Sequence, residues 1–582
     1  MSQSSDLPSL RHSCAHLLAA AVTTLWPNAL ATIGPATDDG FYYDFDFGDE
    51  TISESDFKRI ENTMEKVVQE WRSFEGREVT VLEAQELFKD NPYKLELINE
   101  LAEKGEKITV YQSGQFVDLC RGGHDNEPYK NLRFFKLMSV AGAYWRGSEK
   151  NKMLTRIYGT AFETKKELED YLTMLVEAKK RDHRKLGTDL ELFFIDDMVG
   201  KGLVMWLPKG TIVRDEIEKL ARQKELEYGY QRVVTPHIAK EELFTTSGHL
   251  PYYKDSMYPP MIMDDGTYYL KAMNCPHHHR IFCQKPRSYR DMPLRLAEYG
   301  ICYRNELSGT LSGLLRVRGM AMNDAHIYCR KDQIKDEFKK VIDLTLEYFS
   351  IFNLKDYWFR LSLWSPEHTD KYIDEPQNWA YSEQVIRELL TEMNLPFKEI
   401  ANEAAFYGPK VDVQFRSAVG REETMSTIQL DFAAKGRFGL KYTDNTGAEN
   451  NDVFVIHRAP LSVHERFMAF LIEHYAGAFP LWLAPVQVSL LPLGETHVAY
   501  AQQVLDIFRS KGIRVELDAD AKSIGAKIRH QTLQKVPYMG IMGDKELESK
   551  TISVRTREGK DLGVVSVDSF IQQLISDIEN RT

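Results

Sequence analysis

The sequence predicts a multidomain protein of the mixed α/β (α+β) class, and three observations support this prediction. The chain has 582 residues, which amounts to about four domains at roughly 150 residues each. Its 43% hydrophobic and 27% charged residues are typical of a protein that buries sizeable cores. Segments with helical periodicity, such as 54–72, also alternate with short strand-like segments along the chain.

The net charge of −12 excludes a general-purpose nucleic-acid coat, because non-specific affinity comes from neutralising phosphates. An acidic chain can bind a nucleic acid only through local basic patches, helix N-termini and shape. No uninterrupted apolar stretch reaches about 18 residues, so we predict no association with a membrane.

Cysteine usage indicates a reducing compartment, and we therefore expect a cytoplasmic protein. None of the six cysteines forms a Cys-x-x-Cys pair, and residues 330–582 contain none. Without further information, each cysteine is expected to be a small buried hydrophobe.

The first part of the chain is predicted to contain both helices and strands. Helices are expected at 10–26, 54–72 and 83–104, with a strand at Tyr42–Phe47 and a strand and loop at 107–119. A charged helix is then expected at 164–186. Its end is very basic, and we interpret it as a solvated connecting helix rather than an RNA contact.

A large mixed α/β region follows over 188–478, and Phe479-Pro480 marks its end. The last hundred residues alternate between strands and helices, which predicts a small α/β domain. The strands are expected at 486–491, 513–517, 538–543 and 551–556, and the helices at 495–511, 521–534 and 567–579.

If the protein uses ATP, it must hold the phosphates with side chains. The sequence has no G-x-x-x-x-G-K-[ST] loop and no strand-linked G-x-G-x-x-G. Arginine suits the task because its planar fork pairs with phosphate oxygens. Residues 303–318 predict a hairpin with Arg304 and Glu306 on one strand and Arg316 and Arg318 on the other. Taken alone, such a cluster could equally be a surface salt-bridge network.

Three segments resemble motifs 1, 2 and 3 of the class II aminoacyl-tRNA synthetases, in the right order. They are 206–238, YRNE (303–306) with RVRG (316–319), and HERF (464–467). Six further segments narrow the resemblance to the threonyl-tRNA synthetase family: YLKAMNCPHH (269–278), NDAHIYC (323–329), AFYGPK (405–410), TIQLDF (427–432), VIHRAPL (455–461) and LAPVQV (483–488).

The resemblance implies four regions. They are an α+β editing domain (1–163), a linker helix (164–187), a class II catalytic domain with an antiparallel sheet (188–480) and an α/β anticodon-binding domain (481–582). Because the resemblance starts at about residue 10, the family's small N-terminal ubiquitin-like domain is expected to be absent.

The implied activity is that of a threonine–tRNA ligase, which uses ATP and L-threonine to charge tRNA(Thr). Motif 1 implies a homodimer. Arg304 would hold the α-phosphate, Glu306 would accept from the adenine amino group, and Arg466 would pair with the γ-phosphate. Arg316 belongs to the same catalytic set, and Mg²⁺ is expected with the ATP.

The resemblance also implies one catalytic Zn²⁺ per subunit, held by Cys275, His326 and His457. The spacing of these residues alone predicts nothing. Such a site keeps an open position, where threonine could bind through its amino and hydroxyl groups while valine is rejected. Asp324 is matched to a substrate proton acceptor. Three further residues are expected to line the threonine pocket: Met322, Tyr407 and Gln429.

Zinc does not reject serine, since one missing methyl is worth only about 1–3 kcal/mol. A second, hydrolytic site is therefore needed. His12 and His16 are four residues apart, as are Cys120 and His124, and their ligand count alone would allow a zinc site. The resemblance implies instead a metal-free pocket that hydrolyses seryl-tRNA(Thr), with helpers at Lys94 and Asp118.

Glu546 and Arg555 match positions that read anticodon bases in the family. Other positions depart from its pattern: Met320, Met322, Thr424–Ser426, Ser462–His464 and Ala521. Two alternatives stay open, a stand-alone tRNA-editing hydrolase and a non-charging RNA-binding regulator. The complete set of motif arginines and zinc ligands favours the active ligase.

Overall fold

The computed structural model describes residues 7–368, 371–417 and 422–581, and the chain forms two compact units, Met1–Val176 and Glu177–Thr582. Each unit is considered by itself. Within the described ranges, no helix combines the length and the apolar character needed to cross a membrane.

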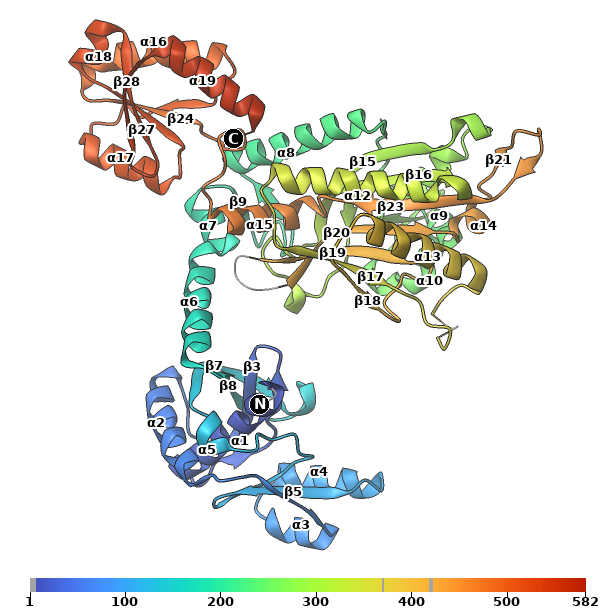
Figure 1. Cartoon of the computed structure of the whole chain (residues 1–582), viewed down its shortest axis with the longest axis vertical. Coiled ribbons are helices and arrows are strands. Elements are labelled where there is room, and N and C mark those ends of the chain that lie inside the picture. The colour runs from blue at the N-terminus through green and yellow to red at the C-terminus, as the bar shows by residue number, and fades with distance from the viewer. Residues whose placement is uncertain (1–6, 369–370, 418–421, 582) are drawn as a thin grey trace. The chain divides into compact units, whose positions relative to one another are not determined.

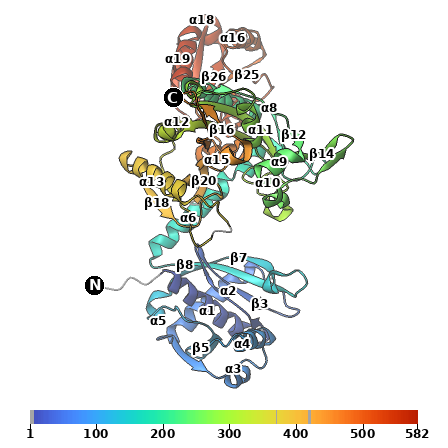
Figure 2. The ribbon, with the colours of Figure 1, turned by 90° about the vertical axis from the view of Figure 1, so that its right-hand side faces the viewer.

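The N-terminal unit is built around one buried helix, α1 (Leu7–Leu25). Nearly every residue of α1 from Leu10 to Val22 is buried, because the helix packs against α2 (Phe57–Val67) and against a sheet. Figure 2 shows α1 lying beside this sheet. The sheet runs in the order β1–β3–β8–β7, and β2 pairs with β3. The bounds of these strands are Leu30–Ala31, Ala36–Thr37, Gly40–Asp46, Phe134–Tyr144 and Met153–Phe162 for β1, β2, β3, β7 and β8.

A second, three-stranded sheet in this unit carries β4 (Glu75–Val79), β5 (Ile108–Ser113) and β6 (Phe116–Leu119). The single helix predicted over 83–104 is wrong. The chain forms α3 (Val81–Leu87) and α4 (Pro92–Glu103), since Asn91 caps the second helix through Lys94 N at 3.1 Å. Pro92 suits the first turn of a helix but cannot continue the preceding one.

The centre of the second unit is an eight-stranded sheet in the order β11–β15–β16–β23–β20–β19–β17–β18, which confirms the predicted antiparallel core. Only the outermost pairs, β11–β15 and β17–β18, are parallel. Figure 1 shows these strands side by side, with α12 along one face. The bounds are Gln231–Arg232 (β11), Leu294–Tyr303 (β15), Gly319–Arg330 (β16), Val453–Ala459 (β23), Glu422–Asp431 (β20), Lys410–Arg416 (β19), Tyr357–Ser362 (β17) and Phe397–Ile400 (β18).

The register of this sheet brings distant parts of the chain together. His326 on β16 lies opposite His457 on β23, and His457 lies opposite Gln429 on β20. Since facing residues of antiparallel strands lie only about 4.5–5.5 Å apart, pairing alone makes neighbours of residues separated by more than a hundred positions.

Helices cover the sheet and complete the largest hydrophobic core. Beneath them, Arg458 of β23 is buried and donates to Glu225 of helix α8 (Pro208–Glu227) at 2.8 Å. Arg458 also donates to Asn323 of β16 at 3.2 Å, so one buried cation joins three elements. The principal helices are α8 (Pro208–Glu227), α12 (Ile334–Ile351), α13 (Pro376–Glu392) and α15 (His464–Tyr475).

The predicted hairpin over 303–318 is partly wrong. Strand β15 ends at Tyr303 and β16 begins only at Gly319, so Arg304, Glu306 and Arg316 lie in an irregular loop. Arg304 N still donates to Arg318 O at 2.9 Å, but Glu306 N turns back to Arg304 O. The strand pairing ends at this point, and the side chain of Arg316 pairs with that of Glu306 at 2.8 Å.

The connecting helix predicted over 164–186 is two helices, α6 (Lys165–Arg181) and α7 (His183–Asp189). Asp182 separates them because its side chain accepts from Arg184 N at 2.8 Å and caps α7. His183 is buried and uses both ring nitrogens, with Glu473 at 2.7 Å and Leu314 N at 3.1 Å. This histidine therefore anchors α7 to α15 and to the 304–318 loop.

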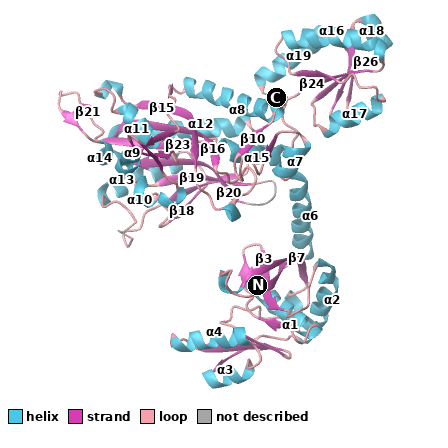
Figure 3. Ribbon diagram, turned by 180° about the vertical axis from the view of Figure 1, so that it is seen from behind, coloured by secondary structure: helices cyan, strands magenta, loops and turns pink. Residues whose placement is uncertain are grey.

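The C-terminal part of the second unit is the predicted small α/β module. Its sheet runs β25–β24–β26–β27–β28, and Figures 1 and 3 show α16 and α19 on one side of it and α17 on the other. Two elements are absent from the prediction, α18 (Asp544–Ser549) and β28 (Asp561–Ser566). The remaining bounds are Val488–Pro492 (β24), Val498–Ser510 (α16), Val515–Leu517 (β25), Ile524–Leu533 (α17), Tyr538–Met542 (β26), Thr551–Thr556 (β27) and Val567–Asn580 (α19).

The second unit also contains shorter elements that frame the site described next. Helix α11 (Cys275–Phe282) precedes β15, and a small sheet orders β12–β14–β13. Their bounds are Ile238–Lys240 (β12), Met261–Met263 (β13) and Gly266–Leu270 (β14), with neighbouring helices α9 (Glu241–Ser247), α10 (His249–Tyr252) and α14 (Ala434–Phe438). Two short hairpins pair Phe193–Ile195 (β9) with Val204–Trp206 (β10), and Tyr442–Thr443 (β21) with Glu449–Asn450 (β22).

Candidate active site and metal-ligand clusters

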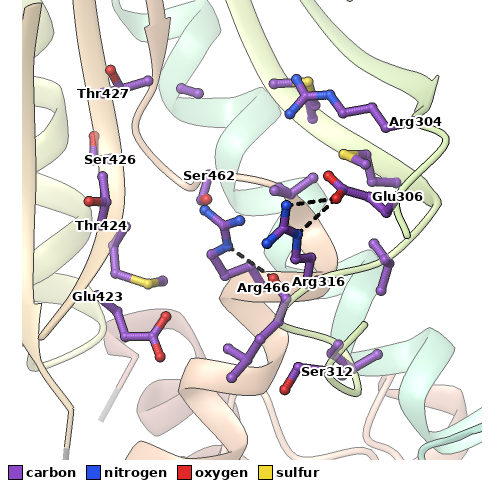
Figure 4. Close-up of a pocket in the computed structure, with 18 of the residues that line it drawn as sticks. Arg304, Glu306, Ser312, Arg316, Glu423, Thr424, Ser426, Thr427, Ser462 and Arg466 are labelled. Carbon is purple, nitrogen blue, oxygen red and sulfur yellow. Dashed lines mark hydrogen bonds and ion pairs between the residues drawn. The ribbon is translucent and has the colours of Figure 1, made fainter. Parts of the chain in front are cut away.

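A cavity of about 690 Å³ opens in the second unit between β20, the 304–318 loop and the start of α15. Figure 4 shows Arg304 and Glu306 on one wall, Thr424 and Ser426 on the opposite wall, and Arg466 between them. The structure thus brings together all four predicted catalytic residues: Arg304, Glu306, Arg316 and Arg466.

The cavity has an excess of positive charge near its centre. Burial lowers the pKa of Arg466, and the charges of Arg304 and Arg316 lower it further against the opposing effect of Glu423. Arg316 pairs with Glu306 at 2.8 Å. A half-buried guanidinium that shares a cavity with two others is stabilised when an anion enters, so this cavity is suited to a polyphosphate.

Hydroxyl and thioether side chains stand at the positions that depart from the family pattern. Met320 and Met322 line the cavity from β16, and Thr424 and Ser426 line it from β20. Ser426 Oγ is buried and has no hydrogen-bond partner among the described residues. Ser462 holds φ = 56°, a region that favours glycine.

Beside this cavity, one ligand atom each of Cys275, His326 and His457 lies within 4.8 Å of the others. His326 Nε2 is buried and finds no partner in the part of the chain that the structure describes. One thiol and two imidazoles are a donor set that Zn²⁺ accepts, and three protein ligands leave a coordination position open. The residues present therefore fit a zinc ion.

The protonation of the cluster agrees with that fit. Burial lowers the pKa of His326 well below its usual value, which keeps the imidazole neutral. Burial and the carboxylates of Asp324 and Asp431 raise the pKa of the Cys275 thiol. A thiolate at this position therefore needs a cation to replace its proton.

The predicted substrate-pocket residues lie next to this cluster. Asp324 is buried and accepts from Asn274 Nδ2 at 3.0 Å, and burial raises its pKa. The Tyr407 hydroxyl donates to Gln429 Oε1, and its ring stacks on His457 at 5.4 Å between centroids. Met322 and Gln429 line the large cavity together with the arginines, and Gln429 also lies opposite His457 in the sheet.

Sequence reasoning missed several residues that contact the cluster. Asp431 Oδ2 lies 3.1 Å from His457 Nε2, and His278 Nδ1 lies 2.8 Å from His326 Nδ1. The three consecutive histidines of α11 are all buried: His277, His278 and His279. His278 and Asp431 lie in the segments 269–278 and 427–432, which the sequence analysis singled out. Only the tertiary structure shows that they contact His326 and His457.

The N-terminal unit holds a second cluster, and it contains all six predicted editing residues. Cys120 Sγ lies 3.3 Å from His124 Nε2 and 3.6 Å from His12 Nε2, while His12 and His16 are 3.2 Å apart. His12 and His16 share one face of α1. Gly122, at φ = 100°, lets the loop turn so that His124 returns beside Cys120.

Behind these four residues stands a buried polar group that fixes their charges. Asp118 contacts His16 at 3.1 Å and Lys94 at 2.5 Å, and it accepts from the Tyr43 hydroxyl. Burial opposes charge on His16, but its hydrogen bond to Asp118 raises its pKa to about 9. Tyr43, which sequence reasoning missed, comes from the correctly predicted strand β3.

Within the same cluster, Cys120 is an activated thiol. Burial would raise its pKa, but hydrogen bonds from His12, His124 and His16 lower it to about 3. A thiolate beside an imidazolium can orient a water molecule and stabilise the charge that develops during hydrolysis. The four donors also have the ligand count of a zinc site.

The two residues matched to anticodon reading lie in the C-terminal module, on α18 and β27. Glu546 accepts from Gly543 N at 2.9 Å and so caps α18. Arg555 is partly exposed at the irregular register between β27 and β28. Helix α18 packs against β27, so both residues belong to one part of the module.

Three family models match separate parts of the chain. Residues 260–475 match the tRNA synthetase class II core domain (G, H, P, S and T), and residues 487–577 match the anticodon binding domain. Residues 108–158 match the threonyl and alanyl tRNA synthetase second additional domain. Together with the antiparallel core and the arginine-lined cavity, these matches define a class II aminoacyl-tRNA synthetase.

The most informative relatives are named enzymes of one specificity. Threonine–tRNA ligase of Staphylococcus carnosus (strain TM300) is 49% identical, and the match covers 98% of this chain and 88% of that one. The ligase of Geobacillus sp. (strain WCH70) is 48% identical over 98% and 89% of the two chains. This chain therefore belongs to the threonine–tRNA ligase family and is an enzyme.

Solved structures agree with this assignment. The crystal structure titled the RNA binding domain of threonyl-tRNA synthetase from Cryptosporidium parvum Iowa II is 33% identical, with a TM-score of 0.64. The match covers 68% of this chain and 98% of that one. The three family models confirm the predicted editing-type, class II and anticodon-binding folds.

Proposed function

We propose that the chain activates L-threonine with ATP to threonyl-adenylate and transfers the threonyl group to tRNA(Thr). The observation that carries this proposal is the arginine-rich cavity of about 690 Å³ in a chain of this family. Three guanidinium groups meet there, those of Arg304, Arg316 and Arg466, and burial already destabilises the charge of Arg466. A nucleoside triphosphate supplies the negative charge that such a cavity lacks.

In this proposal, Arg304 holds the α-phosphate and Arg466 the γ-phosphate, while Glu306 accepts from the adenine amino group. Arg316 completes the set from the same loop. These residues position the phosphates and stabilise the charge that develops during an in-line displacement at phosphorus. Mg²⁺ accompanies ATP in such a reaction.

Cys275, His326 and His457 would hold one Zn²⁺ per subunit beside this cavity. The ion, when bound, supplies an open coordination position for the amino and hydroxyl groups of threonine. Asp324 lies next to this position, and its raised pKa makes it a better acceptor for a proton from the substrate. Valine lacks the hydroxyl group and is rejected, because the buried polar groups of the pocket would be left unpaired.

Serine passes this selection and is removed in the N-terminal unit. We assign hydrolysis of seryl-tRNA(Thr) to His12, His16, Cys120 and His124, with Asp118 and Lys94 fixing their charges. The contacts of 3.1–3.6 Å within the group support this assignment. No metal is required in this proposal, since the Cys120 thiolate and the charged His16 can orient a water molecule and stabilise developing charge without one.

The remaining assignments concern partners. The module over 481–582 would bind the anticodon through Glu546 and Arg555, the editing region would span 1–163 with its linker over 164–187, and the catalytic region 188–480. A homodimer would form through motif 1, the segment 206–238, which carries two strongly exposed apolar side chains, Leu226 and Val234. The cytoplasmic location expected from cysteine usage stays a prediction.

The test is threonine-dependent ATP–pyrophosphate exchange, run with serine and valine in parallel and repeated after zinc removal. Exchange with threonine, weaker exchange with serine, none with valine and loss of exchange without zinc would support the proposal. It would also show that Met320 and Met322 are tolerated. Absence of exchange from folded, zinc-loaded protein would overturn it.

The same preparation separates the alternatives. A stand-alone editing hydrolase would deacylate seryl-tRNA(Thr) without exchanging pyrophosphate. A non-charging RNA-binding regulator would do neither, although it would still bind tRNA(Thr).

A further inference from the structure

We propose that His278 and Glu298 form a positioning relay that holds His326 in the one ring orientation and tautomer that can bind a metal. Neither residue touches the substrate cavity. The proposal rests on the zinc site of the proposed function and adds the residues that set its geometry.

The relay is a continuous chain of short contacts in the interior. His278 lies on α11, three residues after Cys275, and its side chain is fully buried. Its Nδ1 lies 2.8 Å from His326 Nδ1, and its Nε2 lies 3.1 Å from Glu298 Oε2. His278 therefore bridges a carboxylate and a ligand histidine with both ring nitrogens.

Glu298 is itself held in place on three sides. It accepts from Thr235 N at 2.8 Å and from the Thr235 hydroxyl at 2.9 Å. Lys271, which is fully buried, lies 3.5 Å from Glu298 and donates to the Thr235 hydroxyl at 2.7 Å. Burial opposes the charge of Glu298, but the bonds from His278 and Thr235 lower its pKa to about 2. The Glu298 carboxylate that faces His278 Nε2 is therefore ionised and can only accept a hydrogen bond.

The proton positions follow from this acceptor. A neutral imidazole has one donor and one acceptor nitrogen, so His278 in its neutral form donates from Nε2 to Glu298 and accepts at Nδ1. His326 then carries its proton on Nδ1, and its Nε2 keeps a lone pair. This Nε2 is the buried nitrogen that lacks a partner in the described ranges and belongs to the cluster with Cys275 and His457.

The sheet register explains how the relay is assembled. Glu298 on β15 lies opposite Asp324 on β16, and His326 lies opposite Leu296, so Glu298 and His326 are diagonal neighbours. Helix α11 inserts His278 between them. The other ligand histidine, His457, reaches its carboxylate Asp431 directly at 3.1 Å. Both ligand histidines are thus backed by a carboxylate, one directly and one through His278.

A purely structural role would not favour this arrangement. Burying a lysine, a glutamate and a histidine side by side is costly, and well-packed apolar residues are often as stable or more so. A fixed tautomer at a metal ligand accounts for the cost, because groups behind a ligand typically change metal affinity about 10–100-fold.

The experiment measures the affinity of the metal-stripped full-length protein for Zn²⁺ by competition with a chromophoric chelator. Three test variants and one control variant are compared with the wild type. His278→Phe removes both contacts and should weaken zinc binding about 10–100-fold. His278→Gln can still donate to Glu298 and accept from His326, so it should restore most of the affinity.

Glu298→Gln gives the sharpest test. Its amide can donate to His278 Nε2, which would reverse both tautomers and place a proton on His326 Nε2. Zinc binding should therefore weaken by a similar factor although the side chain keeps its shape. His277→Phe is the matched control: it is the adjacent buried histidine of α11, its ring nitrogens have no partner among the described residues, and its zinc affinity should stay unchanged.

The outcomes separate the relay from the site that it supports. Wild-type affinity in both His278→Phe and Glu298→Gln would overturn the relay, as would equal losses in His277→Phe. If His278→Phe fails to fold, as judged by circular dichroism, Glu298→Gln decides alone. If the wild type itself takes up no zinc, the zinc site of the proposed function fails instead.

Discussion

At the scale of single residues, the two clusters shift the pKa of their cysteine in opposite directions. Burial and the carboxylates of Asp324 and Asp431 raise the pKa of Cys275, so its thiolate depends on a cation. Three histidines lower the pKa of Cys120 to about 3 against the effect of burial, so its thiolate needs none. The same residue type is therefore suited to holding a metal in one cluster and to acid–base work in the other.

The Cys120 thiolate predicts an unusual pH profile of alkylation. A thiol of ordinary pKa reacts about tenfold faster with each pH unit below its pKa, because only the thiolate is nucleophilic. Since the pKa of Cys120 is lowered, its reaction with iodoacetamide should hardly change between pH 5 and 8. Mass spectrometry of the labelled peptide measures this rate. Cys283, whose pKa is raised by burial, is the internal control and should show the ordinary rise. A steep profile at Cys120 would contradict the prediction.

Arg466 predicts a separation between the two activities. Arg466→Gln removes a guanidinium from the arginine-lined cavity and should lower kcat/KM for ATP in pyrophosphate exchange by roughly 100-fold. Deacylation of seryl-tRNA(Thr) should not change, because the editing residues belong to the other unit. Arg290→Gln, an exposed arginine outside the cavity, serves as the matched control. Exchange at the wild-type rate in Arg466→Gln would exclude a role in ATP binding.

At the scale of elements, the strands of the large sheet are held in register by buried charge as well as by backbone pairing. Arg458 of β23 donates to Glu225 of α8 and to Asn323 of β16, and its guanidinium also lies over the Tyr230 ring at 4.4 Å. Because His457 and Asp324 are the neighbours of two of these residues in sequence, this network sets the position of the candidate active site. Helix α8 thereby reaches the site without contributing a residue to it.

This network predicts a large loss of stability when it is broken. Glu225→Gln leaves Arg458 buried without a counter-charge and should reduce the free energy of unfolding of the second unit by about 3 kcal/mol. Thermal and denaturant unfolding followed by tryptophan fluorescence would show it. Glu78→Gln, which breaks an exposed pair with Lys107, should change stability by no more than about 0.5 kcal/mol. Equal effects of the two substitutions would refute the role assigned to Arg458.

At the scale of the whole molecule, synthesis and hydrolysis are assigned to two separately folded units. The class II unit also carries exposed apolar side chains on and around motif 1. Val234 is 85% exposed and Leu226 is 75% exposed, so both side chains are available to a partner. Both residues lie in the segment 206–238, which resembles motif 1.

This surface predicts a dimer that charge can dissociate. The chain should have twice its monomer mass by light scattering at micromolar concentration. The double substitution Leu226→Asp and Val234→Asp should shift it toward the monomer, because two unpaired carboxylates would be buried at the interface. Leu82→Asp, which changes a residue that is 78% exposed in the other unit, should leave the mass unchanged. A wild type that is monomeric at this concentration would contradict the homodimer.

Local patterns account for much of what could be predicted from the sequence. Helix α19 and strand β27 follow from periodicity. The pairs His12 with His16 and Cys120 with His124 follow from their spacing along one helix and one loop. The two wrong helix predictions also have local causes. Asn91 with Pro92 interrupts the helix predicted over 83–104, and Asp182 interrupts the helix predicted over 164–186, although the periodicity continues through both. The hairpin predicted over 303–318 is partly wrong for a different reason, because a contact within the loop, between Arg316 and Glu306, takes the place of strand pairing.

The sequence by itself determined the class of fold, the order of its motifs and the residue types available for chemistry. Only the tertiary structure decided that Cys275, His326 and His457 meet, that His278 and Glu298 stand behind His326, and that Tyr43 completes the Asp118 group. The physical reason is that strand register and helix packing set these distances. Pairing between β16 and β23 depends on both strands together, and no window of either sequence contains that information.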